Sequence, residues 1–317
     1  MTIELAAVPA EISFLTDAAF YEVAEATAGW DGEYVQLGRG PCRGSIQQVR
    51  LQGVDLAVDW LDNRVRTRAT PPPGGILLAL SGDSRQPLSW RGRSVAPDTL
   101  VFQGADQEVD VEFSGGVYYW VADAKELEGL LGRRALISSI ARGRLALAPQ
   151  VAERLREFTA GALTSFGSRP EFCVNPKACA ELRNQTLLGV AALLRGASQH
   201  EGRLPPVPAR RAAARRVEAY MLKNLGSSIS MQTLVDFADV RERALRNGFN
   251  DLFGRSPMEH FTTLRLNVAH ARLRAAEVGE TSVGAVARES GFGHLGRFAS
   301  TYRIHFGELP SETLRGS

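Results

Sequence analysis

The stretch Gly291–Pro310, GFGHLGRFASTYRIHFGELP, decides how the C-terminal part of the chain folds. Phe298, Tyr302 and Phe306 recur every four residues, which predicts a helix with one buried apolar stripe. The side chains left to face outward are cationic or carry hydroxyls, namely Arg297, Ser300, Thr301 and Arg303. The stretch therefore predicts a helix that presents a polar, partly cationic face and stops before Pro310.

A shorter helix is predicted directly upstream, over Thr281–Ser290. It opens on two good N-cap residues, has apolar residues at helical spacing, and ends at Gly291, which suits the left-handed position after a helix. A short helix, a glycine turn and a second helix form the helix-turn-helix layout, whose second helix enters the major groove of DNA. The alternative is a pair of packed helices in an ordinary core.

An imperfect copy of this pattern lies about 50 residues earlier, a spacing read directly from the sequence. Ile229–Asp239 reads as a short amphipathic helix, Val240–Phe249 reads as a second helix, and Met258–Val278 predicts one long helix between the copies. Such a helix would hold two reading helices at a fixed separation, as successive major-groove faces about 34 Å apart require.

At these residues the chain resembles the AraC/XylS family of bacterial transcription regulators, over roughly residues 215–315. The resemblance is carried in the second unit by Gly291, Phe292, Phe298, Tyr302, Phe306, Gly307 and Pro310, and in the first by Phe249, Gly254, Ser256, Pro257, Arg265, Leu266 and Ala269. The chain departs from the family at Asp239 and Arg241, where glycine and a capping serine are usual, and at Thr313 and Leu314. The first unit is therefore expected to read bases more weakly than the second.

The resemblance implies which residues meet DNA. The expected base-reading residues are Glu242, Arg243, Arg246 and Asn247 on the first helix and His294, Leu295, Arg297 and Ser300 on the second. Arg pairs with guanine, Asn pairs with adenine, and Leu contacts a thymine methyl. The expected phosphate contacts are Arg255, Arg265 and Arg303. The alternative for each arginine is a solvated surface charge.

Composition indicates two globular domains: 317 residues, 44% hydrophobic and 23% charged, with a net charge of +2. Residues 1–200 carry 20 basic and 23 acidic side chains, whereas residues 201–317 carry 17 and 12. Positive charge is thus concentrated in the segment expected to meet phosphates. The predicted boundaries are a sensor and dimerisation domain over 1–196, a Gly- and Pro-rich linker over 197–209, and a DNA-binding domain over 210–317.

The N-terminal part predicts an α+β arrangement. Residues 1 to about 28 have a helical pattern, residues 30–40 are rich in turn formers, and residues 44–122 form short runs that alternate every second residue. These runs predict an antiparallel sandwich or small barrel, and the family resemblance implies a cupin-like sensor domain. Helices are predicted over about 125–196. They could pair two subunits, as in the family, or pack on their own barrel.

A small barrel can hold one ligand. The expected walls are Trp60, Trp90, Phe102, Phe113, Tyr119 and Trp120, with Arg64, Arg66 or Arg68 as partners for an anionic group; core packing explains the same aromatic residues. The acidic residues of the strands alternate, which favours solvent-facing positions over a hydrolase pair. Residues 29–38 and 43–46 resemble the N-terminal part of regulators of the ethanolamine-utilisation type, without identifying a ligand.

The chain is not expected to be an enzyme. Cupin enzymes usually hold their metal on histidines, and no histidine precedes His200, so neither a metal nor a cofactor is expected. The alternative is an enzyme-like cupin domain fused to a DNA-binding anchor. No secretory signal or membrane span is apparent, and three cysteines without paired spacing suit the cytoplasm. The sequence thus predicts a DNA-binding activator that responds to a small molecule, and the family resemblance implies a homodimer that contacts RNA polymerase.

Overall fold

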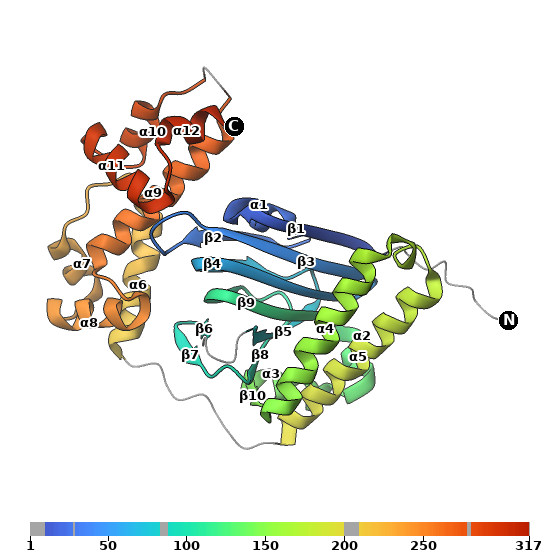
Figure 1. Ribbon diagram of the computed structural model, residues 1–317. Coiled ribbons are helices and arrows are strands. Elements are labelled where there is room, and N and C mark those ends of the chain that lie inside the picture. The colour runs from blue at the N-terminus through green and yellow to red at the C-terminus, as the bar shows by residue number, and fades with distance from the viewer. Residues whose placement is uncertain (1–9, 28, 83–87, 200–208, 278–279, 317) are drawn as a thin grey trace. The chain divides into compact units, whose positions relative to one another are not determined.

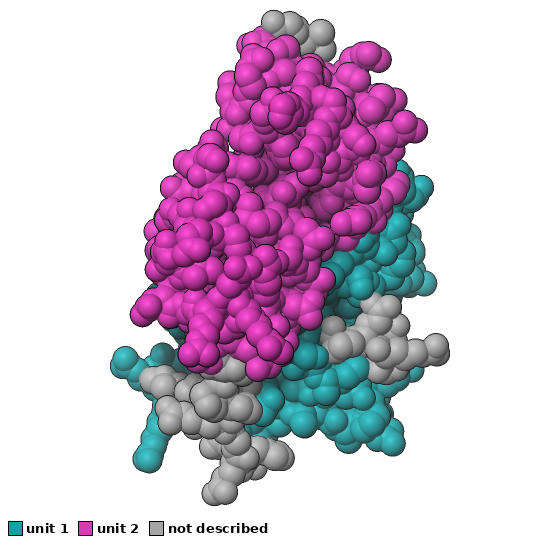
Figure 2. Space-filling view, turned by 90° about the vertical axis from the view of Figure 1, so that its left-hand side faces the viewer, with its two compact units in different colours: residues 1–34, 43–204 teal, residues 35–42, 205–317 magenta. Residues whose placement is uncertain are grey.

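The computed structural model describes residues 10–27, 29–82, 88–199, 209–277 and 280–316. The chain divides into two compact units, coloured separately in Figure 2. Unit 1 comprises Met1–Tyr34 with Arg43–Leu204, and unit 2 comprises Val35–Cys42 with Pro205–Ser317. Within the described residues, no helix is both long enough and apolar enough to cross a membrane.

Unit 1 is built on a ten-stranded antiparallel sheet (Figure 1). Its main order is β1-β3-β4-β9-β5-β8-β10, with β2 added to β4 and the β6–β7 hairpin added to β9. The strands are β1 Glu11–Ala19, β2 Asp31–Gln36, β3 Arg43–Leu51, β4 Val54–Thr70, β5 Gly75–Ser81, β6 Leu88–Trp90, β7 Arg93–Val95, β8 Thr99–Gln103, β9 Val109–Asp123 and β10 Arg144–Ala146. The α+β class and the antiparallel sheet are as the sequence predicts.

The two longest strands, β4 and β9, pair with each other over nearly their whole length. Each of these strands spans two of the short runs that the sequence pattern separates. The register shifts between Leu61 and Val65 of β4, but the hydrogen-bonded pairing with β9 continues on both sides of the shift. Successive side chains point to opposite faces of a strand, so this pair decides which residues face each side of the sheet.

One face of the sheet is covered by α2 Ala124–Leu131, α3 Arg133–Arg142, α4 Pro149–Ser168 and α5 Pro176–Gln199, with a 3₁₀ turn at Pro170–Phe172. The short helix α1 Phe20–Ala26 follows β1 directly and packs on β1 and β3. Leu56, Leu78 and Trp120 of the sheet share one core with Leu163 of α4 and Val190 of α5. Trp120 Nε1 donates to the Thr159 hydroxyl at 3.0 Å, which satisfies its only polar group inside this core.

The prediction of helix at the N-terminus is wrong for Glu11–Ala19, which forms β1. Its partner β3 lies about 30 residues further along the chain, and such distant pairing leaves only a weak trace in local periodicity. The turn-rich prediction for residues 30–40 is likewise wrong for Asp31–Gln36, which forms β2. Most of the predicted linker falls on residues 200–208, which lie outside the described residues.

Unit 2 is helical apart from its Val35–Cys42 segment. Its helices are α6 Ala209–Lys223, α7 Met231–Ala238, α8 Glu242–Phe253, α9 Pro257–Ala275, α10 Val283–Glu289, α11 Leu295–Phe306 and α12 Pro310–Arg315. Inside the core, His260 Nε2 of α9 and Glu218 Oε1 of α6 lie 2.9 Å apart and are fully buried. The His260 ring stacks on Phe253 of α8 at 4.1 Å between centroids, so this pair ties three helices together.

The Val35–Cys42 segment is held to α9 and α11 by hydrogen bonds. The Asn267 side chain of α9 accepts from the Gln36 amide at 2.8 Å and donates to the Gln36 carbonyl at 3.0 Å. Gln36 Nε2 donates to the His305 carbonyl of α11 at 2.8 Å. This segment therefore belongs to unit 2 by its polar contacts as well as by its packing.

Candidate nucleic-acid interface and ligand pocket

The turn between α10 and α11 has the conformation that the sequence predicts. Ser282 caps α10 by accepting from the Ala285 amide at 3.2 Å, and Gly291 is in the left-handed region at φ +81°. A Cβ at Gly291 would lie 2.7 Å from the Arg265 guanidinium, so glycine is needed here for both backbone and space. The chain then enters α11 at His294.

The α11 helix buries its predicted aromatic stripe. Phe298, Tyr302 and Phe306 are buried, with ring centroids 5.5 and 4.7 Å apart along the stripe. The opposite face carries five of the six residues predicted there in exposed positions, namely His294, Leu295, Arg297, Ser300 and Arg303, whereas Thr301 is half-buried. Leu295 is 50% exposed.

The α7 and α8 helices repeat this geometry with different residues. Asp239 occupies the left-handed position between them at φ 52° and ψ 47°, which Asp tolerates better than most residues. Arg241 stands at the N-cap of α8 without a side-chain cap, as its sequence implies. The predicted residues of α8 are all exposed, namely Glu242, Arg243, Arg246 and Asn247.

Two of these residues are already paired with each other. Glu242 and Arg246 form an ion pair one turn apart, with Arg246 Nη2 2.7 Å from Glu242 Oε1. Both side chains are about half exposed, so the pair contributes at most a few tenths of a kcal/mol and can open when a stronger partner arrives. Arg246 can therefore still meet DNA, at a small cost.

Arg255 and Arg265 differ from the prediction that they contact phosphates, because their guanidinium groups are engaged within unit 2. Arg265 donates to the carbonyls of Leu225, at 2.7 Å, and Ser227, and it lies 4.0 Å from the centre of the Phe261 ring. Burial lowers its pKa. Arg255 donates to the Thr263 hydroxyl at 2.7 Å and to the Leu37 carbonyl. Both side chains hold secondary structure elements together.

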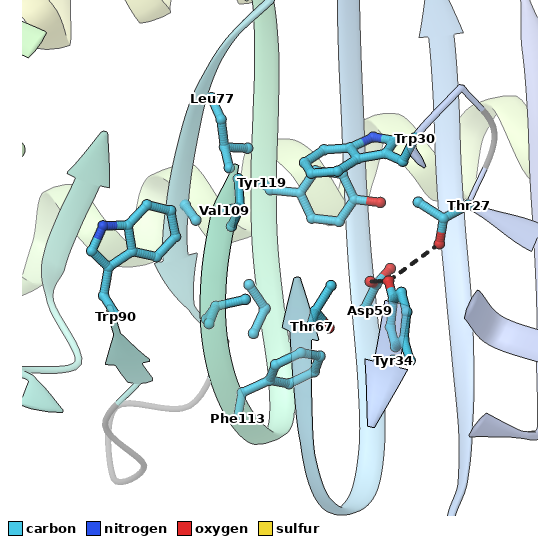
Figure 3. A pocket seen from close by; sticks show the side chains of 13 residues that line it. Thr27, Trp30, Tyr34, Asp59, Thr67, Leu77, Trp90, Val109, Phe113 and Tyr119 are labelled. Carbon is cyan, nitrogen blue, oxygen red and sulfur yellow. Dashed lines mark hydrogen bonds between the residues drawn. The ribbon is translucent and has the colours of Figure 1, made fainter. Parts of the chain in front are cut away.

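The pocket of unit 1 lies on the face of the sheet away from α4 and α5 (Figure 3). It has a volume of about 40 Å³ and is lined by Thr27, Trp30, Tyr34, Asp59, Thr67, Leu77, Ala79, Trp90, Val109, Val111, Phe113, Val117 and Tyr119. Of the predicted walls, Trp90, Phe113 and Tyr119 belong to it. Trp60, Phe102 and Trp120 are absent from the lining.

The alternation of the strands explains these differences. Trp120 follows Tyr119, so it points to the opposite face and enters the core under α4. Phe102 joins the same core, and Trp60 is 47% exposed. Arg64, Arg66 and Arg68 alternate with Val65 and Thr67 and are therefore directed away from the pocket. Arg66 instead pairs with Asp110 at 2.8 Å, and Arg64 pairs with Glu112 at 2.6 Å.

Asp59 is the polar residue of the pocket that the sequence pattern assigned wrongly to solvent. It is 4% exposed, and the Tyr34 hydroxyl donates to its Oδ2 at 3.2 Å. The Thr27 hydroxyl lies 3.4 Å from that of Tyr34. Burial raises the pKa of Asp59 to about 7, an effect that the Tyr34 and Tyr119 hydroxyls oppose. Asp59 lies four residues after Asp55, so both side chains point to the same face of β4, but this spacing alone does not show that the face is covered.

The family described as "Helix-turn-helix domain" matches residues 234–316. The XylDLEGF operon transcriptional activator of Pseudomonas putida is 38% identical over 100 residues, covering 32% of this chain and 31% of that protein. The probable thc operon regulatory protein of Rhodococcus erythropolis is 30% identical over 122 residues, covering 38% and 37%. This chain thus matches about a third of the length of these relatives.

A solved structure, a probable AraC family transcriptional regulator from Rhodopseudomonas palustris, is 37% identical over 33% of this chain and 96% of that one, with a TM-score of 0.32. The family match over residues 234–316 includes the left-handed residues Asp239 and Gly291 and the helices α8 and α11 that follow them. Through these C-terminal helices, the chain belongs to the AraC/XylS family of helix-turn-helix transcription regulators.

Proposed function

We propose that this protein is a transcription activator that binds double-stranded DNA through unit 2 and responds to a small molecule bound in unit 1. The observation that carries the proposal is the exposed face of α11. Leu295, Arg297 and Ser300 are exposed on this face, just after the turn at Gly291. An arginine, a hydroxyl and an apolar side chain on one helix face are the groups that read base edges in the major groove.

We further propose that α7–α8 and α10–α11 are two helix-turn-helix units. The support is their common geometry, a left-handed residue at Asp239 or Gly291 followed by a helix with one buried and one polar face. The α9 helix runs between them over Pro257–Ala275 and would fix their separation. Arg303 remains the proposed phosphate contact, whereas Arg255 and Arg265 leave that role because they donate to groups within unit 2.

We propose that unit 1 has the regulatory role. Its antiparallel sheet would serve as a cupin-like effector-binding domain, and the α4–α5 layer would mediate pairing of two copies. The activator names of the relatives support contact with RNA polymerase and a cytoplasmic location for this protein. The proposed domain boundaries are those predicted from the sequence, with a linker between about residues 197 and 209.

The test is selection of binding sites by the full chain from a pool of genomic fragments, followed by affinity measurements on the selected site and a scrambled copy. Arg297→Ala should weaken binding to the selected site by about 1–3 kcal/mol and weaken binding to the scrambled site much less. Lys223→Ala removes the same charge from the exposed end of α6 and should change both affinities little. Failure of the full chain to prefer any site over the scrambled copy would refute the proposal.

A further inference from the structure

The pocket of unit 1 combines aromatic walls with one carboxylate. Five aromatic side chains line it, from Trp30, Tyr34, Trp90, Phe113 and Tyr119. Trp30 meets Tyr119 edge to face with centroids 5.3 Å apart. None of the thirteen described lining residues is Lys, Arg or His, and Asp59 is the one acidic residue among them.

Among the described residues, several polar atoms of this pocket have no partner in hydrogen-bond geometry. They are Asp59 Oδ1, Thr67 Oγ1, Trp30 Nε1 and the Tyr119 hydroxyl. The Tyr119 hydroxyl lies near enough to Asp59, and Thr67 near enough to Tyr34, to influence the pKa of these neighbours, but neither has hydrogen-bond geometry. Asp59, Thr67 and Tyr119 are each at most 6% exposed. A buried polar group without a partner costs about 1–3 kcal/mol, so the three oxygens of Asp59, Thr67 and Tyr119 around one cavity indicate a missing partner. Trp30 Nε1 is a donor, so the same partner would not satisfy it.

The chemistry of the unpaired atoms indicates what that partner carries. Asp59 Oδ1, Thr67 Oγ1 and the Tyr119 oxygen can all accept hydrogen bonds, and they come from β4 and β9, which are paired side by side. A positive group with N–H donors would satisfy these acceptors and neutralise the carboxylate. An anion would face Asp59 with no compensating positive side chain, and a neutral ligand would leave Asp59 without a counter-charge, so that burial would favour its protonated form.

We propose that this pocket binds the ammonium end of a small organic cation, with Asp59 as its counter-ion and the aromatic rings as its walls. This assignment rests on the proposed sensor role of unit 1. The faces of Trp and Tyr attract cations through their ring quadrupoles, and the attraction grows when water is excluded. The volume of about 40 Å³ matches roughly three water molecules, which limits the bound group to a few non-hydrogen atoms.

The test uses the full chain and a set of probes of similar size but different charge. The cations are methylammonium and tetramethylammonium, the neutral probe is tert-butanol, and the anion is acetate, at constant ionic strength. Binding is followed by tryptophan fluorescence, since all four tryptophans lie between residues 30 and 120 of unit 1. At least one cation should bind about tenfold or more tightly than tert-butanol and acetate.

Asp59→Asn keeps the shape of the side chain and should weaken cation binding by about tenfold or more, while leaving tert-butanol unchanged. Tyr119→Phe removes one hydroxyl and should weaken methylammonium more than tetramethylammonium, because only methylammonium has N–H donors. Asp55→Asn is the matched control, since Asp55 is a buried carboxylate of the same strand outside the pocket. It should leave cation affinity within about twofold.

Equal binding of all probes, unchanged affinity in Asp59→Asn, or no binding of either cation at millimolar concentration would overturn the assignment. Binding of the wild-type chain to its selected DNA site is measured on the same preparation. Cation binding without site preference would refute the regulator proposal and leave the pocket assignment standing, and the reverse result would refute the pocket assignment alone.

Discussion

Asp59→Asn should make unit 1 more stable at pH 8 and leave its stability nearly unchanged at pH 4. Burial raises the pKa of Asp59 to about 7, against an ordinary value of 3.8. Between these values the folded state binds more protons than the unfolded state, so the free energy of unfolding falls as the pH rises through this window. The contribution is fully present below about pH 4 and is lost above about pH 7. Asn has no charge to bury and removes this dependence.

The magnitude follows from the difference between the two pKa values. About three pKa units at roughly 1.4 kcal/mol each give about 4 kcal/mol as the largest difference between variant and wild type at pH 8. Solvent screening reduces this figure little, because Asp59 is 4% exposed. Water entering the pocket reduces it more, and about 2–4 kcal/mol is the expected range.

The assay is urea unfolding between pH 4 and pH 8, followed by tryptophan fluorescence, in buffers that contain no amine. Because the tryptophans all lie in unit 1, this signal reports that unit alone. Glu108→Gln removes a carboxylate from an exposed position of the same unit and should change stability by less than about 0.5 kcal/mol at every pH. A difference between Asp59→Asn and wild type that stays constant with pH would refute the reasoning.

Further predictions concern unit 2. Gly291→Ala should lower its stability by about 1–2 kcal/mol in thermal unfolding followed by circular dichroism, because of the positive φ and the Arg265 guanidinium beside it; an unchanged midpoint would contradict this. Arg265→Met should lower stability by about 1–3 kcal/mol without changing the salt dependence of DNA affinity. Arg303→Ala should instead reduce the slope of log affinity against log salt by about 1, with stability unchanged; the opposite pattern would reverse the two roles. Glu218→Ala should cost about 3 kcal/mol, because His260 loses its buried partner; a loss below about 1 kcal/mol would show that the pair is not structural.

The sequence by itself determined the helices, the turns and the exposed helix faces of unit 2, because these features depend on residues close together in the chain. The apolar spacing in α11 predicts a buried stripe wherever the helix packs, and the left-handed positions at Asp239 and Gly291 need residues that tolerate positive φ. These are properties of a few adjacent residues. The exposed faces of α8 and α11 follow from the same periodicity, and the structure leaves every residue predicted to read bases on those faces exposed, whereas Thr301 is half-buried.

Only the tertiary structure decided which groups Arg255 and Arg265 contact and which residues line the pocket of unit 1. Arg265 lies on a helix face that reads as exposed, but the carbonyls of Leu225 and Ser227 reach it from a loop about 40 residues away. In β4 and β9 both faces are covered, so alternation no longer distinguishes solvent from interior, and Asp59 reads as a surface residue although it is buried. Sequence spacing specifies that Tyr119 and Trp120 face opposite ways, but only the packing of α4 and α5 specifies which face is the core and which face holds the pocket.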